Sequence, residues 1–196
     1  KYSFPFSPDL FDGRILGSEP ERGDVAVFRH PERTDIDYVK RIVGLPGDRL
    51  QVKQGRLFIN GEIVARRRVD PSQLDVPYED LELPLSSDNR PGCESRAYLE
   101  TLPNGVDHFI QEAKGDCHWT DNTGVFVVPE GHFFAMGDNR DNSNDSRFGV
   151  GYVPLENFVG RANIIFFSIS GGASPLEIWR WPSELRLGRF FSSAEG

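Results

Sequence analysis

Eleven consecutive residues without an apolar side chain, at positions 137–147, constrain this chain more than any other feature. They read Gly-Asp-Asn-Arg-Asp-Asn-Ser-Asn-Asp-Ser-Arg and lie between apolar, β-prone runs at 132–136 and 151–153. Short Asp, Asn and Ser side chains hydrogen-bond their own backbone, so such a loop can hold a fixed shape without a core. Because loops held by rigid strands often carry binding and catalytic groups, residues 137–147 are a candidate site.

Three interpretations of this loop compete. The first is a solvated turn. The second is a calcium loop, because Asn139, Asp141, Ser143 and Asp145 alternate as oxygen ligands do, but the Gly and Glu that an EF-hand needs at its sixth and twelfth positions are missing. The third is a catalytic loop, in which Ser143 positions another residue while Asp145 and Arg147 brace the backbone.

Lys40 is the candidate partner, within a strand-like run at 37–48 that ends in a Gly/Pro turn. Alternation places Tyr38, Lys40 and Ile42 on one face, so the lysine has apolar neighbours. A free lysine is neutral in only about 0.04% of molecules at pH 7, so a lysine that acts as a general base needs its pKa lowered by roughly three units. Burial can supply that shift. The alternative is a lysine on an edge strand that extends its amine into solvent.

Residues 21–28, 37–48 and 137–147 resemble three motif boxes of the bacterial type I signal peptidases, or leader peptidases, in the family's order. The resemblance runs from about Glu21 to Gly160. It implies a membrane-anchored serine endopeptidase with a Ser/Lys dyad and no cofactor or metal. Such an enzyme removes N-terminal signal peptides from exported precursors on the periplasmic side of the bacterial cytoplasmic membrane.

The resemblance also implies roles for individual residues. Lys40 matches the general base, and Ser143 matches the hydroxyl that hydrogen-bonds the lysine amine. The positions that match supports of the active site are Asp138, Asp145, Arg147 and, with a less defined role, Arg41.

The implied substrate is an extended peptide that adds as a strand beside residues 37–40, which include Asp37 and Tyr38. Small pockets would accept Ala-like residues on the acyl side of the cut. By resemblance, Val27 and Val39 form walls of these pockets.

One departure from the family pattern concerns the nucleophile. The family's attacking serine lies in a Ser-Met-x-Pro-Thr box before the first matched segment, and this sequence has no such box. Ser3, Ser7 and Ser18 lack its context, and the only methionine is Met136. We therefore expect the chain to begin just after its own nucleophile and to lack that serine.

The expected fold is mostly β: a signal-peptidase-like catalytic core with an inserted, smaller β-rich subdomain. The expected core comprises residues 23–65 and 123–170, and the insert, rich in proline, comprises 66–122. An extended arm at 1–22 and a membrane-proximal tail at 171–196 complete the chain.

Strands are expected at 25–28, 38–45 and 49–52. Gln54-Gly55 and Asn60-Gly61 predict a meander of short hairpins over 49–65. No stretch shows sustained helical periodicity.

The insert holds the chain's two cysteines, Cys93 and Cys117. A disulfide between them would contribute roughly 3–3.5 kcal/mol in the chain-entropy model and would suit an oxidising compartment. Two free thiols are an alternative. A zinc site using Cys117 and His118 is disfavoured because it offers too few ligands.

A net charge of −8 argues against nucleic acid as a partner. No segment has the ~18–20 apolar residues of a transmembrane helix. The tail carries Trp179 and Trp181 with Arg186 and Arg189, a combination that favours membrane lipid at the interface, although packing on the core would also explain it.

Two alternatives to the peptidase function remain. One is a peptide-binding domain of the same fold that has lost catalysis. The other is a peptidase that processes conjugation or pilus proteins, although the long insert fits that class poorly.

Overall fold

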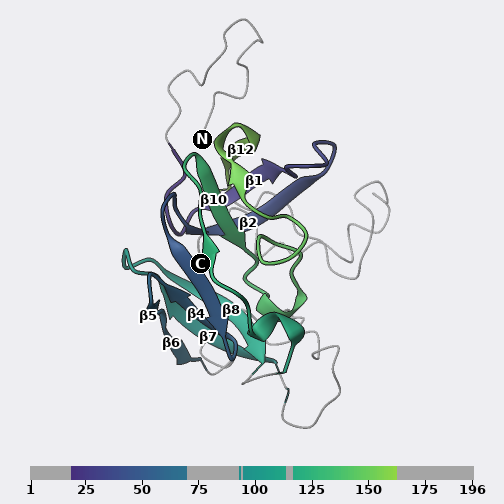
Figure 1. The fold of residues 1–196 in the computed structure, drawn as a ribbon. Helices are drawn as coiled ribbons and strands as arrows, with labels where there is room; N and C mark the ends of the chain where they lie inside the picture. The colour runs from purple at the N-terminus through teal and green to yellow at the C-terminus, as the bar shows by residue number, and fades with distance from the viewer. Residues whose placement is uncertain (1–18, 70–92, 94, 114–116, 163–196) are drawn as a thin grey trace, which may run out of the picture.

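The computed structural model describes residues 19–69, 93, 95–113 and 117–162 (Figure 1). Most of the expected N-terminal arm, the proline-rich stretch at 70–92 and the tail with its tryptophans lie outside the described residues. Within the described ranges the chain is mostly β, as predicted, and the strands form three antiparallel sheets.

The five-stranded sheet carries the candidate lysine and has the order β11-β10-β2-β1-β12. Strands β1 and β2 form a hairpin, whereas β12 joins β1 from the far end of the described chain. The strands are β1 (Val25–Arg29), β2 (Asp37–Gly44), β10 (His132–Met136), β11 (Val153–Pro154) and β12 (Phe158–Arg161).

The predicted meander of hairpins is confirmed in the four-stranded sheet, of order β5-β4-β3-β9. Positive φ angles at Gln54 (50°), Gly55 (67°), Asn60 (55°) and Gly61 (88°) give both turns the backbone of type I′ hairpins. The strands are β3 (Arg49–Lys53), β4 (Arg56–Ile59), β5 (Glu62–Ile63) and β9 (Phe126–Val127).

The three-stranded sheet, β6-β7-β8, comes from the segment predicted as an insert, residues 66–122, except that β6 begins one residue earlier, at Ala65. It comprises β6 (Ala65–Arg68), β7 (Ser95–Thr101) and β8 (Asp107–Ala113). The two cysteines that flank β7 and β8 are joined as the disulfide Cys93–Cys117. Whether this segment is a separate subdomain stays a prediction.

Three short 3₁₀ helices complete the described chain: η2 (Trp119–Asp121), η3 (Arg140–Asn142) and η4 (Leu155–Asn157). In Figure 1 the five-stranded sheet occupies the upper part of the view and the strands of the other two sheets lie below it. The helix η3 lies within the polar loop, between the end of β10 and residue 147.

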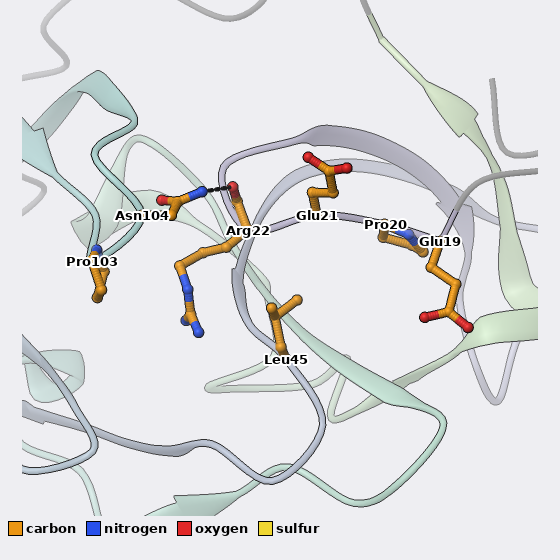
Figure 2. A pocket seen from close by; sticks show the side chains of 7 residues that line it. All are labelled: Glu19, Pro20, Glu21, Arg22, Leu45, Pro103 and Asn104. Atoms are coloured by element: carbon orange, nitrogen blue, oxygen red, sulfur yellow. Dashed lines mark hydrogen bonds between the residues drawn. The ribbon is translucent and has the colours of Figure 1, made fainter.

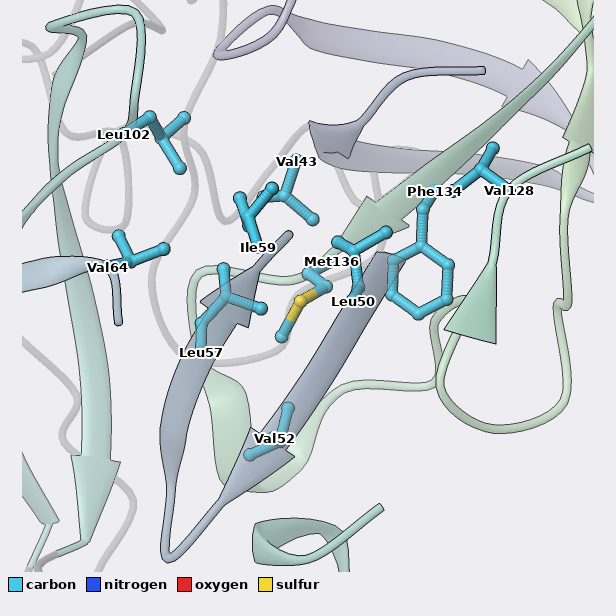
Figure 3. Packing of buried hydrophobic residues seen from close by; sticks show 10 residues of the cluster. All are labelled: Val43, Leu50, Val52, Leu57, Ile59, Val64, Leu102, Val128, Phe134 and Met136. Atoms are coloured by element: carbon cyan, nitrogen blue, oxygen red, sulfur yellow. The ribbon is translucent and has the colours of Figure 1, made fainter. Parts of the chain in front are cut away.

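The C-terminal half of β2 contributes side chains to two buried clusters of the hydrophobic core. Ile42 packs with one buried cluster, and Val43 with another that includes side chains of the five-stranded and the four-stranded sheet. Figure 3 shows this second cluster, with Phe134 and Met136 of β10 beside the four-stranded sheet. Burying each such side chain contributes about 1.5–3 kcal/mol. The core therefore anchors one half of β2 firmly and leaves its other half, residues 37–40, near the surface.

Candidate active site

Strand β2 delivers Lys40 to the polar loop. Lys40 pairs with Ala26 of β1, and its half-buried side chain reaches across to the loop, where Nζ donates a hydrogen bond to Ser143 Oγ at 3.0 Å. The Tyr38 ring lies 5.9 Å from the same nitrogen. The sequence prediction placed these two functional groups together across 103 positions, and they do meet.

The surroundings of Lys40 favour the neutral amine. Burial lowers the pKa of Lys40 from its ordinary value of 10.5. The negative charge of Asp145 opposes this shift, Arg147 supports it and Asp138 opposes it. Desolvation therefore prevails over two nearby carboxylates, and more of the lysine is unprotonated at neutral pH than in water.

The loop is not a solvated turn, because several of its charged side chains are buried. Asp145 is fully buried, and its carboxylate accepts hydrogen bonds from the backbone N–H of Gly137 (3.0 Å) and of Arg147 (3.0 Å). The Arg147 guanidinium donates to the same carboxylate at 2.8 and 3.0 Å and to the carbonyl of Arg140 at 2.7 Å. These contacts fix both ends of the segment that carries Ser143.

Gly137 lets the loop approach Lys40 closely. A Cβ at this position would lie 2.1 Å from Ser143 Oγ and 2.6 Å from Ser143 Cβ, closer than atoms can pack. The same point lies 3.5 Å from Lys40 Nζ. Glycine therefore provides the space in which the amine and the hydroxyl meet.

Arg41 supports the loop from the other face of β2. Its buried guanidinium forms a two-pronged ion pair with Asp138 at 2.9 and 3.0 Å and donates to the carbonyl of Gly23 at 2.8 Å. Asp138 is the first charged residue of the loop, so this pair sets where the chain leaves β10.

The residues predicted to face the substrate lie along the outer half of β2. Val39 is 56% exposed and pairs with Val27, so the two side chains lie next to each other on one face. The Tyr38 hydroxyl accepts a hydrogen bond from Asn144 at 3.0 Å. Asp37 is exposed at the start of the strand. Among the residues that the structure describes, no strand pairs with residues 37–40 on the side of β10, which pairs only with Arg41, Ile42 and Gly44.

Comparison with known proteins shows to which family this chain belongs. Residues 8–167 match the family model described as signal peptidase, peptidase S26. The chain belongs to the signal peptidase family. Signal peptidase I of Rickettsia typhi is 38% identical over 206 residues, which cover 97% of this chain and 71% of that protein. Signal peptidase I of Rickettsia akari is also 38% identical, over 96% of this chain and 70% of its own length.

A crystal structure of a signal peptidase I from Enterococcus faecalis has 24% sequence identity and a TM-score of 0.41, covering 74% of this chain and 97% of that one. In the described part of this member of the signal peptidase family, no helix is long and apolar enough to cross a membrane.

The sequence did not predict how the β6-β7-β8 sheet holds the polar loop of this signal peptidase. Arg140 is buried and makes a two-pronged ion pair with Glu100 of β7, and His108 of β8 lies 3.3 Å from the same carboxylate. The backbone N–H of Gln111 donates to the carbonyl of Asp138 at 2.8 Å. Nothing in the sequence marks Glu100, because one acidic residue 40 positions before its partner forms no pattern.

Two pockets differ in their relation to the signal peptidase site. One, of about 440 Å³, includes Ser143 in its wall together with Trp119 and Phe148, whose rings lie 4.0 Å apart. The other, of about 620 Å³, is lined by residues 19–22, Leu45 and the 103–104 turn (Figure 2). Lys40 and the polar loop contribute nothing to the second pocket, so of these two pockets the first adjoins the site.

Metal ligands were predicted to be absent, and the rejected pair Cys117 and His118 is not a metal site, since Cys117 is bonded to Cys93. A group of three carboxylates, from Glu112, Asp121 and Asp141, is the candidate set of metal ligands in the described part of this signal peptidase.

Proposed function

We propose that this protein is a serine endopeptidase that cleaves N-terminal signal peptides from exported precursors, with Lys40 as its general base. The observation that carries the proposal is the hydrogen bond of 3.0 Å from Lys40 Nζ to Ser143 Oγ, made by a half-buried lysine whose pKa is lowered by burial. A general base must be unprotonated and must point at the proton that it removes. The lowered pKa of Lys40 meets the first requirement, and the hydrogen bond to Ser143 meets the second.

The proposed chemistry is acyl transfer in two steps. Neutral Lys40 takes the proton of a serine hydroxyl as that oxygen attacks the scissile carbonyl, and then gives the proton to the leaving amine. In the second step Lys40 removes a proton from the water that hydrolyses the ester. Because Ser143 accepts one N–H of the amine, the nitrogen lone pair is free to point toward the attacking hydroxyl.

The attacking serine is proposed, from the family resemblance, to lie N-terminal to the matched segments, and Ser143 is proposed to orient Lys40. Geometry alone offers a competing assignment, in which Ser143 itself attacks. The two assignments predict different losses: replacing an orienting hydroxyl lowers the rate by about 10²–10³-fold, whereas replacing the nucleophile removes the covalent pathway altogether.

The substrate is proposed to bind as an added strand along residues 37–40 of β2. On the side away from β1, no strand of the described residues pairs with the backbone N–H and C=O groups of that edge. Val27 and Val39 lie on one face beside it. A small apolar side chain on the acyl side of the cut would pack against this valine pair.

The proposed location is the periplasmic face of the cytoplasmic membrane, with membrane lipid as a further partner. The disulfide Cys93–Cys117 supports an oxidising compartment. The net charge of −8 supports the exclusion of nucleic acid as a partner.

The test is cleavage of a secretory precursor in detergent by the 196-residue chain and by the full product of its gene, each with Lys40→Ala and Ser143→Ala variants. Lys40→Ala should reduce kcat/KM by at least ~10⁴-fold without unfolding the protein, and Ser143→Ala by less. Undiminished cleavage by Lys40→Ala would refute the assignment. Binding of the precursor without cleavage by any form would favour the non-catalytic peptide-binding alternative.

A further inference from the structure

Three carboxylates from separate elements converge on the inner side of the polar loop. Glu112 is the last residue but one of β8, Asp121 is the last residue of η2, and Asp141 lies in η3, two residues before Ser143. One carboxylate oxygen from each lies within 4.8 Å of the others. Glu112 and Asp121 are only 2% and 1% exposed, and Asp141 is half-buried. These residues lie apart from the contact between Lys40 and Ser143 and have no role in the proposed mechanism.

Two of the oxygens in this cluster are buried without a donor. Glu112 Oε1 and Asp141 Oδ1 accept no hydrogen bond, although the other oxygen of Asp141 accepts one from the Ala113 N–H at 2.7 Å. Asp121 is held differently, since its Oδ2 accepts from the N–H groups of Cys117 and His118 at 2.6 and 2.7 Å. An unsatisfied carboxylate oxygen in the interior is costly, so either a cation or a proton shared between Glu112 and Asp141 is required there.

The neighbouring guanidinium groups are already engaged elsewhere. Arg140 directs both terminal nitrogens at Glu100, and its buried Nε donates no hydrogen bond. Arg147 binds Asp145 and a backbone carbonyl. Arg66, which also acts on Glu112 electrostatically, donates to the carbonyl of Gly55 at 2.7 Å. None of these contacts satisfies the two orphaned oxygens.

We propose that Glu112, Asp121 and Asp141 form a binding site for a divalent cation, Ca²⁺ in preference to Mg²⁺, that ties the β6-β7-β8 sheet to the loop carrying Ser143. Oxygen-only ligands select hard cations. Ca²⁺ accepts several protein carboxylates in a flexible geometry, whereas Mg²⁺ keeps most of its waters and is held by one or two carboxylates. A cluster that offers three carboxylates therefore suits the larger ion.

The ion has a route to these carboxylates. Asp141 is half-buried and forms part of the wall of the 440 Å³ pocket together with His118 and Thr120, so the pocket leads to one residue of the cluster. Water in the pocket can supply the remaining ligands that Ca²⁺ needs beyond three carboxylates.

A proton is the competitor for the same position. Burial first, and then the charge of Asp141, raise the pKa of Glu112 well above its ordinary value, and burial also raises the pKa of Asp141. Cation binding must therefore displace a proton, and the affinity for Ca²⁺ should rise with pH. The charged and titratable groups that face the pair are Asp121, His118, Arg66, Arg140 and Arg147.

The experiment measures Ca²⁺ binding by titration calorimetry and thermal unfolding, on the 196-residue chain after treatment with a chelator. We expect one Ca²⁺ per chain, with a Kd on the order of 0.1–1 mM, and a higher unfolding midpoint when Ca²⁺ is added. Mg²⁺ should bind at least ~10-fold more weakly. Glu112→Gln should weaken Ca²⁺ binding at least ~10-fold, and Glu62→Gln, an exposed carboxylate of β5, should leave it unchanged.

Asp141→Asn is the second variant, in case Glu112→Gln does not fold, and should also weaken Ca²⁺ binding at least ~10-fold. Two results would overturn the proposal: a midpoint of the parent chain that does not respond to 10 mM Ca²⁺, on the order of ten times the highest expected Kd, or a Glu112→Gln chain that binds Ca²⁺ as the parent does. The first result would mean that a shared proton holds the carboxyls together. Because no step involves a peptide, either result leaves the proposed peptidase function standing.

Discussion

As the proposed general base, Lys40 should set the pH range in which the protein cleaves precursors. Burial, the largest influence on its pKa, lowers that pKa from 10.5 by favouring the neutral amine. Only the unprotonated lysine can take a proton, so the rate must rise with pH up to the lowered pKa.

For the full product of the gene, kcat/KM for precursor cleavage should therefore increase about tenfold per pH unit on the acid side and level off below pH 10.5. Lys40→Met should raise the unfolding midpoint near neutral pH, because it removes an amine that folding partly desolvates. The parent chain should gain stability relative to this variant as the pH rises toward 10.5, since unfolded Lys40 binds the proton more tightly. A rate that begins to rise only above pH 10 would contradict the shift.

Gly137 should be as sensitive to substitution as a reacting group, although it has no side chain. Gly137→Ala would place a methyl group against Ser143 and displace it from Lys40, so we expect about a 10²-fold loss of kcat with little change in KM. Gly124→Ala is the matched control, because a Cβ there meets no atom within 4 Å. Equal activities of the two variants would show that the loop tolerates the displacement.

At the scale of elements, η3 is held by a buried ion pair between its own Arg140 and Glu100 of the β6-β7-β8 sheet. Burial alone would raise the pKa of Glu100, but Arg140 and His108 bring it down to about 2. The carboxylate therefore stays charged in the folded protein at pH values where it is protonated in the unfolded chain.

Glu100→Gln should destabilise the protein by about 3–5 kcal/mol, because it leaves buried Arg140 without its counter-charge. The double variant Glu100→Leu/Arg140→Met should recover much of that loss. Glu100 has a depressed pKa, so its stabilisation is complete above pH 4.5 and is lost as the pH falls toward about 2. Urea unfolding between pH 2 and 7 measures both effects, and a Glu130→Gln chain, altered at an exposed position, is the control.

How far the elements could be predicted depended on whether their signals were local. The hairpins over residues 49–65 were predicted correctly because Gln54-Gly55 and Asn60-Gly61 specify their own turns. Lys40 and Ser143 were paired correctly, but only through resemblance to a family. The Glu100–Arg140 pair and the Glu112 cluster were not found, because such contacts arise where the β6-β7-β8 sheet meets the short helices η2 and η3 and leave no periodic trace in the sequence.

For the molecule as a whole, the disulfide Cys93–Cys117 closes a loop between residues 24 positions apart. Reduction should lower the free energy of unfolding by about 3.5 kcal/mol in the chain-entropy model, and a Cys93→Ser/Cys117→Ser chain should match the reduced protein. Thermal unfolding with and without a reductant provides the measurement. An unchanged midpoint would mean that the packing of β7 and β8 alone supplies the stability of this region.

The sheet order β11-β10-β2-β1-β12 also constrains when the protein can fold. Strand β1 is synthesised near the start of the described chain, yet one of its two neighbours is β12. Ala26 can therefore pair with Arg161 only after β12 has been synthesised. Strand β2 likewise cannot complete its pairing until β10, about 90 residues later in the sequence, has been made. Such long-range pairing slows folding and leaves strand edges unpaired in the meantime. A chain emerging from a ribosome or a translocation channel can therefore form the β3–β4–β5 meander early, but it becomes a peptidase only after almost all of its described residues have emerged.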